Sequence, residues 1–179
     1  MFCSGVVGFN SESGVLKQVQ NDDRNNKKNY ERVIEIARKE IGVREEGGEN
    51  CGVAVKGYLS YVGIKSPAPW CAAFVSWCFG QAGFVQPRTA WCPALFPDAR
   101  SGKAPQGRLR KDPLPGRIMG IYFPSKGRIA HCGIVEKVRG DFVYVIEGNT
   151  NVAGGRDGDR VMRRLRHNRT IARYADWLN

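Results

Sequence analysis

The sequence predicts an α+β domain in which N-terminal helices pack on an antiparallel sheet. The first half of the 179-residue chain repeats apolar residues at helical spacing. The second half alternates apolar and polar residues in short runs, as strands do. Because the helices come first and the strands follow, an antiparallel sheet is expected.

Residues 1–28 are expected to form a flexible N-terminal tail, and residues 29–179 a single domain. The stretch QVQNDDRNNKK, from Gln18 to Lys28, is polar and charged. Such a composition cannot bury enough apolar surface to offset the entropy lost on ordering.

Helical periodicity begins after this tail, where Val33, Ile34, Ala37 and Ile41 recur at helical spacing. The third expected helix follows Pro67 and Pro69 and is apolar almost throughout, so we expect it to be buried on most sides. The three helices are expected over residues 29–42, 53–62, and from 70 to a stop at Gly80 or Gly83.

Residues 85–116 are rich in Pro, Gly and Arg and are expected to form an irregular connection, with a short helix near residues 93–99. After this connection the period changes to that of strands. Strands are expected over residues 117–123, 131–138, 142–147 and 160–166.

The chain is strongly basic, with 28 Lys and Arg against 17 Asp and Glu, a formal net charge of +11. Such a charge attracts polyanions, among them nucleic acids and the anionic polymers of bacterial walls, although solubility alone explains it equally well. No apolar run approaches the roughly 18 residues of a membrane span. The first residues lack the basic start and the continuous apolar stretch of a signal peptide.

Cys71 is the candidate nucleophile. It falls in the first turn of the third expected helix, where unpaired amides and the helix dipole favour a thiolate. Cys78 lies further along the same apolar helix and fits a buried structural thiol better. For Cys71 as well, a simple core position is the alternative.

His131 is the candidate base, because it stands at the start of the apolar strand HCGIVEKV. The second histidine, His167, lies among arginines, where a solvated or anion-facing role is expected. A three-residue hairpin loop at residues 139–141 would pair His131 with Asn149 and place Glu147 diagonally on the same face. A two-residue loop would turn His131 to the opposite face. The expected site therefore has the nucleophile, base and orienting group of a cysteine hydrolase.

The remaining cysteines are expected to be mostly buried free thiols. None of their spacings gives the Cys-x-x-Cys pattern of a zinc site, and no metal or other cofactor is expected. These residues are Cys3, Cys51, Cys78, Cys92 and Cys132.

The stretch APWCAAFVSWCFGQAG resembles the nucleophile helix of the CHAP family, the cysteine, histidine-dependent amidohydrolases and peptidases. HCGIV followed by VIEGNTN resembles the family's histidine strand and its Glu-x-Asn ending, and IARKEIGVREEGGENCGVAVKGYLSYVGI its usual lead-in. The resemblance covers about residues 30–166.

This resemblance implies a papain-like fold and metal-free cleavage of an amide bond in bacterial peptidoglycan, outside the cytoplasm, by a monomer. It implies that Cys71 is the nucleophile, His131 the general base and Glu147 its orienting group, with Asn149 assisting orientation or the oxyanion. Trp70 and Asn50 are the expected substrate contacts, although core packing explains Trp70 equally well.

Three rival functions remain open from the sequence. A small-molecule amidase or an acyl transferase would use the same thioester chemistry. A nucleic-acid-binding domain would use the basic charge, but the arginines at residues 160–169 lack interleaved aromatic residues, and no helix-turn-helix or zinc-finger spacing is present. A catalytically inert wall-binding module is the third.

Overall fold

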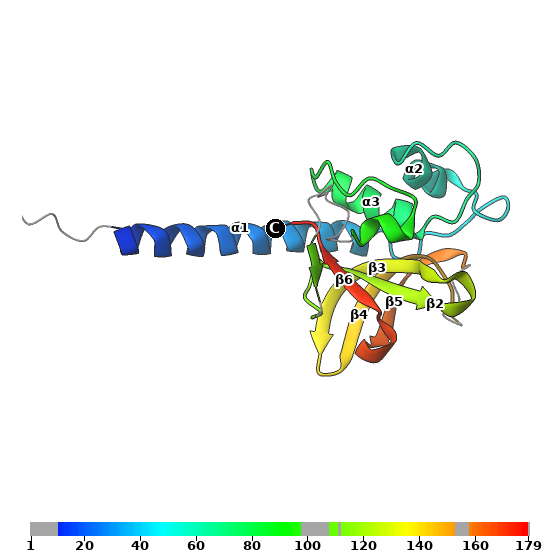
Figure 1. Cartoon of the computed structure of the whole chain (residues 1–179). Helices are drawn as coiled ribbons and strands as arrows, with labels where there is room; N and C mark the ends of the chain where they lie inside the picture. Colours follow the sequence, from blue (N-terminus) through cyan, green and yellow to red (C-terminus); the bar gives the residue numbers. More distant parts are fainter. Residues whose placement is uncertain (1–10, 98–107, 111, 153–157, 179) are drawn as a thin grey trace, which may run out of the picture.

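The computed structural model describes residues 11–97, 108–110, 112–152 and 158–178. Its helices lie on one side of an antiparallel sheet, as the sequence predicts (Figure 1). The helices are α1 (Ser11–Lys39), α2 (Val53–Tyr61) and α3 (Cys71–Gln81), with 3-10 turns η1 (Cys92–Leu95), η3 (Pro124–Lys126) and η4 (Asn168–Thr170). The strands are β1 (Arg108–Arg110), β2 (Ile118–Phe123), β3 (Arg128–Arg139), β4 (Phe142–Thr150), β5 (Arg160–His167) and β6 (Arg173–Asp176).

The first helix differs from the prediction at its start. α1 begins at Ser11 instead of residue 29, so much of the segment expected to be a flexible tail is helical and extends away from the domain (Figure 1). This segment contains no proline and a single glycine, Gly14. Once the packed C-terminal part of a helix has formed, each added residue costs little, so a polar sequence can prolong it. Residues 1–10 lie outside the described residues, and the domain boundary at residue 29 stays a prediction.

The six strands are ordered β1-β6-β2-β3-β4-β5. The four strands expected from the sequence are confirmed, with β3 beginning three residues earlier and β4 ending later. The sequence did not predict β1 and β6, which pair with each other beside β2. These two strands are short and carry too few apolar residues to give a clear alternation. The short helix expected near residues 93–99 is the 3-10 turn η1, and residues 98 and 99 lie outside the described part.

The main core lies between α3 and the sheet. Nearly every side chain of α3 is buried, which confirms the expectation for this helix. Gly148 of β4 allows the close approach, because a Cβ atom there would come within 2.7 Å of Trp70 and 2.8 Å of Phe74. α3 ends just before Gly83, whose φ of 89° suits the left-handed residue that closes a helix.

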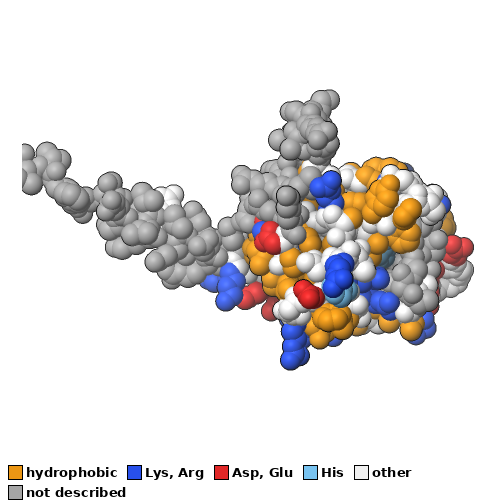
Figure 2. Space-filling view, turned by 60° about the horizontal axis from the view of Figure 1, so that its bottom comes forward, with side chains coloured by type: hydrophobic (Ala, Val, Ile, Leu, Met, Phe, Trp, Pro, Cys, Tyr) orange, Lys and Arg blue, Asp and Glu red, His pale blue; other side chains and the backbone are white. Residues whose placement is uncertain are grey.

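The opposite face of the sheet carries a second, smaller apolar cluster, in which Ile171 from the segment after η4 takes part. Its buried members are Met119, Val135, Val143, Val145, Ile171 and Tyr174. Figure 2, turned toward this side, shows basic side chains scattered among hydrophobic ones. Among the described residues, no helix is both long and apolar enough to cross a membrane.

The hairpin of β3 and β4 has the shorter of the two loops that the sequence left open. Arg139 pairs with Phe142, so the turn contains two residues and not three. Gly140 has a φ of 57°, as the first central position of such a turn favours. By itself, this turn would place His131 on the wrong face of the sheet.

A β-bulge at Glu136 reverses the effect of the short turn. Val135 pairs with Val145 and Lys137 with Tyr144, so Glu136 is the additional residue. Beyond it, Ile134 faces Ile146, which is the pairing that a three-residue loop would have produced. The loop is therefore the two-residue alternative, but the pairing at Ile134 and Val135 is the one expected for the three-residue alternative.

The bulge is fixed by charge pairs from two other elements. The buried carboxylate of Glu136 accepts a hydrogen bond from Arg38 of α1 at 2.6 Å and two from Arg163 of β5 at 2.5 and 2.8 Å. Both arginines lower the pKa of Glu136, Arg163 more strongly, so the group stays ionised. The position of the bulge thus depends on the contacts of Glu136 with α1 and β5.

Candidate active site

Cys71 is the first residue of α3 and is 4% exposed. The backbone N–H of the preceding Trp70 donates a hydrogen bond to Asn149 Oδ1 at 3.2 Å. This contact attaches the start of α3 to the end of β4. The structure therefore places the predicted nucleophile at a helix N-terminus, next to the strand that carries Glu147.

His131 and Glu147 form a buried pair. His131 Nε2 donates to Glu147 Oε2 at 2.9 Å, and neither side chain is more than 1% exposed. Gly133 makes room for the carboxylate, because a Cβ there would come within 2.7 Å of Glu147 Cγ. With Nε2 engaged, Nδ1 is the ring nitrogen left for the thiol, and it has no hydrogen-bond partner among the described residues.

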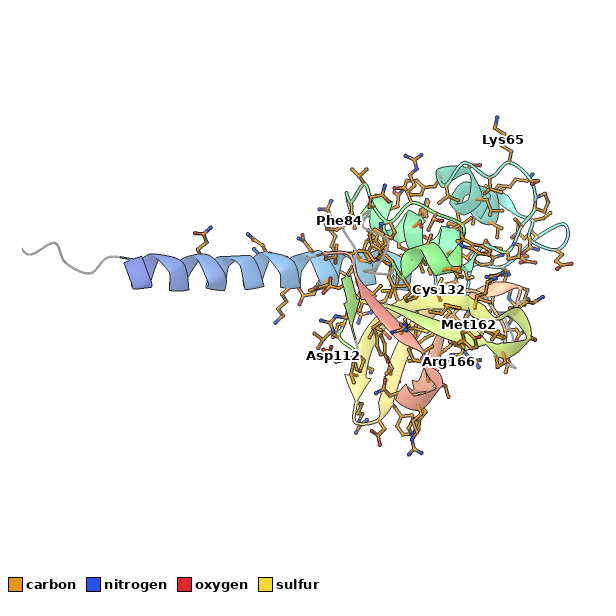
Figure 3. The ribbon with its side chains drawn as sticks, in the orientation of Figure 1. Lys65, Phe84, Asp112, Cys132, Met162 and Arg166 are labelled. Carbon is orange, nitrogen blue, oxygen red and sulfur yellow. The ribbon has the colours of Figure 1, made fainter. Side chains whose placement is uncertain are left out.

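Glu147 has a further partner that the sequence analysis missed. Arg166 of β5 donates from Nε to Oε1 at 2.7 Å and from Nη2 to Oε2 at 2.6 Å. Thr150 Oγ1 adds a hydrogen bond at 3.2 Å. Figure 3 labels Arg166 among the strands of the sheet. In the sequence, Arg166 is one of several arginines in a basic run, and only its place on the folded strand distinguishes it.

The two partners of Glu147 set its charge. Burial alone would raise its pKa, but hydrogen bonds from Arg166 and His131 lower the pKa of Glu147 to about 2. For His131, burial acts against the charged form, while its interactions with the nearby Cys71 and with Glu147 raise its pKa to about 9. At neutral pH the pair is therefore a carboxylate beside an imidazolium.

Two other cysteines lie next to Cys71. Contacts with Cys132 and Cys92 hold the pKa of Cys71 well below its usual value, against the effect of burial, and His131 acts in the same direction. Burial raises the pKa of Cys132, so its thiol stays protonated and can donate to Cys71. The geometry and charges of Cys71 and His131 thus fit a resting thiolate–imidazolium pair.

Asn149 connects several parts of the site. Its φ is 54°, and its side-chain nitrogen donates to the carbonyl of Gly158 at 2.6 Å. The same nitrogen makes two longer contacts of 3.4 Å each, with Glu45 Oε1 and with Asn50 Oδ1. Both polar atoms of the side chain are thus used to hold loops and the start of α3. This arrangement favours a positioning role for Asn149.

A polar cavity lies beside Asn149, with a volume of about 270 Å³. The predicted substrate contact Asn50 lines it, together with three acidic side chains. The lining residues are Glu45, Glu49, Asn50, Asn149, Asn151, Gly158 and Asp159.

Trp70 does not line this cavity. It is 0% exposed, stacks on Tyr58 with ring centroids 5.5 Å apart, and donates from Nε1 to Glu45 at 2.7 Å. This burial favours the core-packing alternative, and a substrate contact at Trp70 stays a prediction. The sequence does not indicate whether the Trp70 side chain, next to Cys71, points into the core or toward a substrate.

The second histidine, His167, lies outside the site. It accepts a hydrogen bond from the Arg169 amide and packs against Phe142. The described cysteines are all free thiols, as predicted, and Cys3 lies outside the described residues.

Comparisons with known proteins give one family match and several similar solved structures. Residues 63–149 match the family profile described as the CHAP domain. No curated protein sequence matches the chain. Two solved structures are similar at low identity. "The crystal structure of Ly7917" shares 17% identity with a TM-score of 0.47, covering 82% of this chain and 61% of that one. "The crystal structure of Ly7917 with the hydrolyzing product of MDP" shares 19% identity with a TM-score of 0.42, covering 82% and 62%.

The chain thus spans less than two thirds of these two solved chains. The matched residues 63–149 run from the turn after α2 to the end of β4. They contain Cys71, His131, Glu147 and Asn149 in the order that the sequence resemblance predicted. Residues 63–149 therefore match the CHAP domain family, as the sequence resemblance predicted.

Proposed function

We propose that this protein is a cysteine hydrolase that cleaves an amide bond of bacterial peptidoglycan, either between the sugar and the stem peptide or within the stem. In this proposal Cys71 is the nucleophile, His131 the general base and acid, and Glu147 the group that orients the imidazole. The observation that carries it is the buried His131–Glu147 pair beside a cysteine at a helix N-terminus. The CHAP match supports the substrate class.

The reaction begins from the thiolate of Cys71. It attacks the carbonyl carbon of the amide, and the first-turn amides of α3 face the negative charge that develops on the oxygen. His131 donates its proton to the leaving nitrogen, which releases the amine and leaves a thioester. His131, now neutral, takes a proton from water, which attacks the thioester and frees Cys71.

Digestion of purified peptidoglycan tests this function. Mass spectrometry of the soluble products is expected to show fragments cut at an amide bond. Intact stem peptides with a free amino end identify the sugar–peptide bond, whereas glycan fragments that carry shortened stems identify a bond within the stem. Wall incubated without the protein is the control. Products with newly cut glycan chains and intact peptide links would contradict the proposal.

The pH dependence of kcat/KM tests the ion pair. Activity requires Cys71 without its proton and His131 with it, so the rate is expected to fall as pH rises through about 9, where His131 loses its proton. In Glu147→Gln, the imidazolium loses its carboxylate partner, so its pKa falls and the alkaline limb moves at least about one pH unit lower. His167→Gln is the matched control and should leave this limb in place. An alkaline limb that does not move in Glu147→Gln would show that another group titrates.

A further inference from the structure

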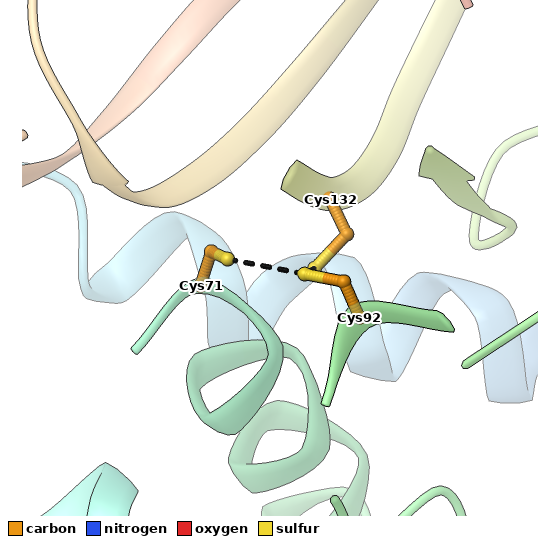
Figure 4. Close-up of side chains that lie close together, drawn as sticks. All are labelled: Cys71, Cys92 and Cys132. Atoms are coloured by element: carbon orange, nitrogen blue, oxygen red, sulfur yellow. Dashed lines mark hydrogen bonds between the residues drawn. The ribbon is translucent and has the colours of Figure 1, made fainter. Parts of the chain in front are cut away.

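Three thiols from distant parts of the chain meet at the nucleophile. Cys71 comes from the start of α3, Cys92 from η1 and Cys132 from β3 (Figure 4). The sulfur of Cys92 lies 3.4 Å from that of Cys71 and 3.8 Å from that of Cys132. All three sulfur atoms lie within 4.8 Å of one another. One of the three is the proposed nucleophile, and the reaction described above does not need the other two as reacting groups.

The sulfur–sulfur distances suit three ligands of one metal ion. The three cysteines are free thiols in this structure. Zinc–sulfur bonds of about 2.3 Å in a tetrahedral arrangement hold their sulfur atoms about 3.8 Å apart. The observed distances are close to this value, so small rotations of the side chains would bring three thiolates onto one ion.

The surroundings of the three cysteines can accommodate the negative charge of three thiolates. The three cysteines are at most 5% exposed, and soft thiolates in such a setting prefer Zn²⁺ and similar thiophilic ions over Mg²⁺ or Ca²⁺. The Arg128 guanidinium lies 4.1 Å from the ring centroid of Trp91, the residue before Cys92. A positive group thus lies close to the negative charge that three thiolates would bring.

We propose that Cys71, Cys92 and Cys132 form a binding site for a thiophilic metal ion such as Zn²⁺, and that the bound ion keeps the enzyme inactive. Three thiolates and one Zn²⁺ leave a fourth coordination position for water. A sulfur that donates its lone pair to the ion cannot attack an amide carbon, so the metal is an inhibitor and not a cofactor. The binding stands on the thiol geometry alone, whereas the inhibition rests on the proposed function.

Binding is tested with Co²⁺ on the full chain, kept reduced by a phosphine that contains no thiol. One equivalent of Co²⁺ is expected to give the charge-transfer absorption of cobalt thiolate, and Zn²⁺ should displace it while Mg²⁺ does not. Replacing a residue that only supports a metal ligand lowers metal affinity about 10- to 100-fold. The variants Cys92→Ser and Cys132→Ser each remove a ligand itself, so each should lower the Co²⁺ affinity at least tenfold. Cys78→Ala removes a buried thiol of α3 outside the cluster and should bind Co²⁺ normally.

The outcomes separate this proposal from the proposed function. A missing thiolate band in the reduced wild-type chain overturns the metal site, and so does equal Co²⁺ affinity in wild type and a folded Cys92→Ser or Cys132→Ser. If the band forms and wall hydrolysis stops with Zn²⁺ and returns with a chelator, both parts hold. If the band forms but hydrolysis continues at saturating Zn²⁺, the inhibitory role is wrong. If the band forms and no condition gives hydrolysis, the metal site stands and the proposed function fails.

Discussion

The variant Cys71→Ala is expected to lose hydrolysis of peptidoglycan by at least about 10⁴-fold, because removal of the nucleophile leaves only binding and oxyanion stabilisation. Its fold should be retained, since alanine suits the first turn of a helix and the sulfur is a small group at the edge of the core. Release of soluble fragments from purified wall measures the activity, and circular dichroism with thermal unfolding measures the fold.

Cys78→Ala is the matched control for this variant. It removes a thiol of the same helix that is completely buried and has no part in the proposed chemistry. We expect it to lower the free energy of unfolding modestly, because a small cavity replaces the sulfur, while activity is retained. Full activity in Cys71→Ala, or a selective loss in Cys78→Ala, would mean that the nucleophile has been assigned to the wrong thiol.

The second large effect is expected at Glu147. Its replacement by Ala removes the only carboxylate bonded to both His131 and Arg166 among the described residues. Arg166, whose side chain is 14% exposed, would keep a largely buried charge without its partner. Such a break is expected to lower the free energy of unfolding by about 3–5 kcal/mol, and to reduce kcat because the imidazole is no longer oriented. Urea unfolding and wall-digestion rates measure the two effects.

A double variant separates stability from catalysis. Glu147→Leu with Arg166→Met replaces the buried charges by apolar groups of similar size, so much of the lost stability should return. Activity should not return, because His131 still lacks its carboxylate. Recovery of both properties together would show that Glu147 acts only through the stability of the fold.

Within the part of the chain that the structure describes, the sequence was sufficient to predict the α+β class, all three helices and four of the six strands, because long periodic segments give a strong signal. It failed at β1 and β6, which are three and four residues long. It also failed at the start of α1, where a polar sequence continues a helix that packing has already formed. In each case the element depends on its neighbours more than on its own pattern.

For the candidate site, the sequence predicted Cys71, His131 and Glu147, whose arrangement depends on one helix start and one hairpin. It could not predict Arg166, since this side chain differs from the other arginines of β5 only in what it contacts. The sequence also could not predict the cluster of three thiols. Zinc motifs are recognised by ligands that are close in sequence, whereas Cys71, Cys92 and Cys132 come from three separate elements.

The bulge at Glu136 has a practical consequence. It separates the hairpin into a solvent-side tip and an end that carries His131 and Glu147, whose pairing is fixed by contacts with α1 and β5. The tip at Gly140 and Asp141 is exposed and touches neither the thiols nor His131. Exposed tips of this kind accept inserted sequence readily. A short epitope or a wall-targeting peptide grafted between Gly140 and Asp141 would therefore extend this protein without disturbing the residues that are proposed to carry out its chemistry.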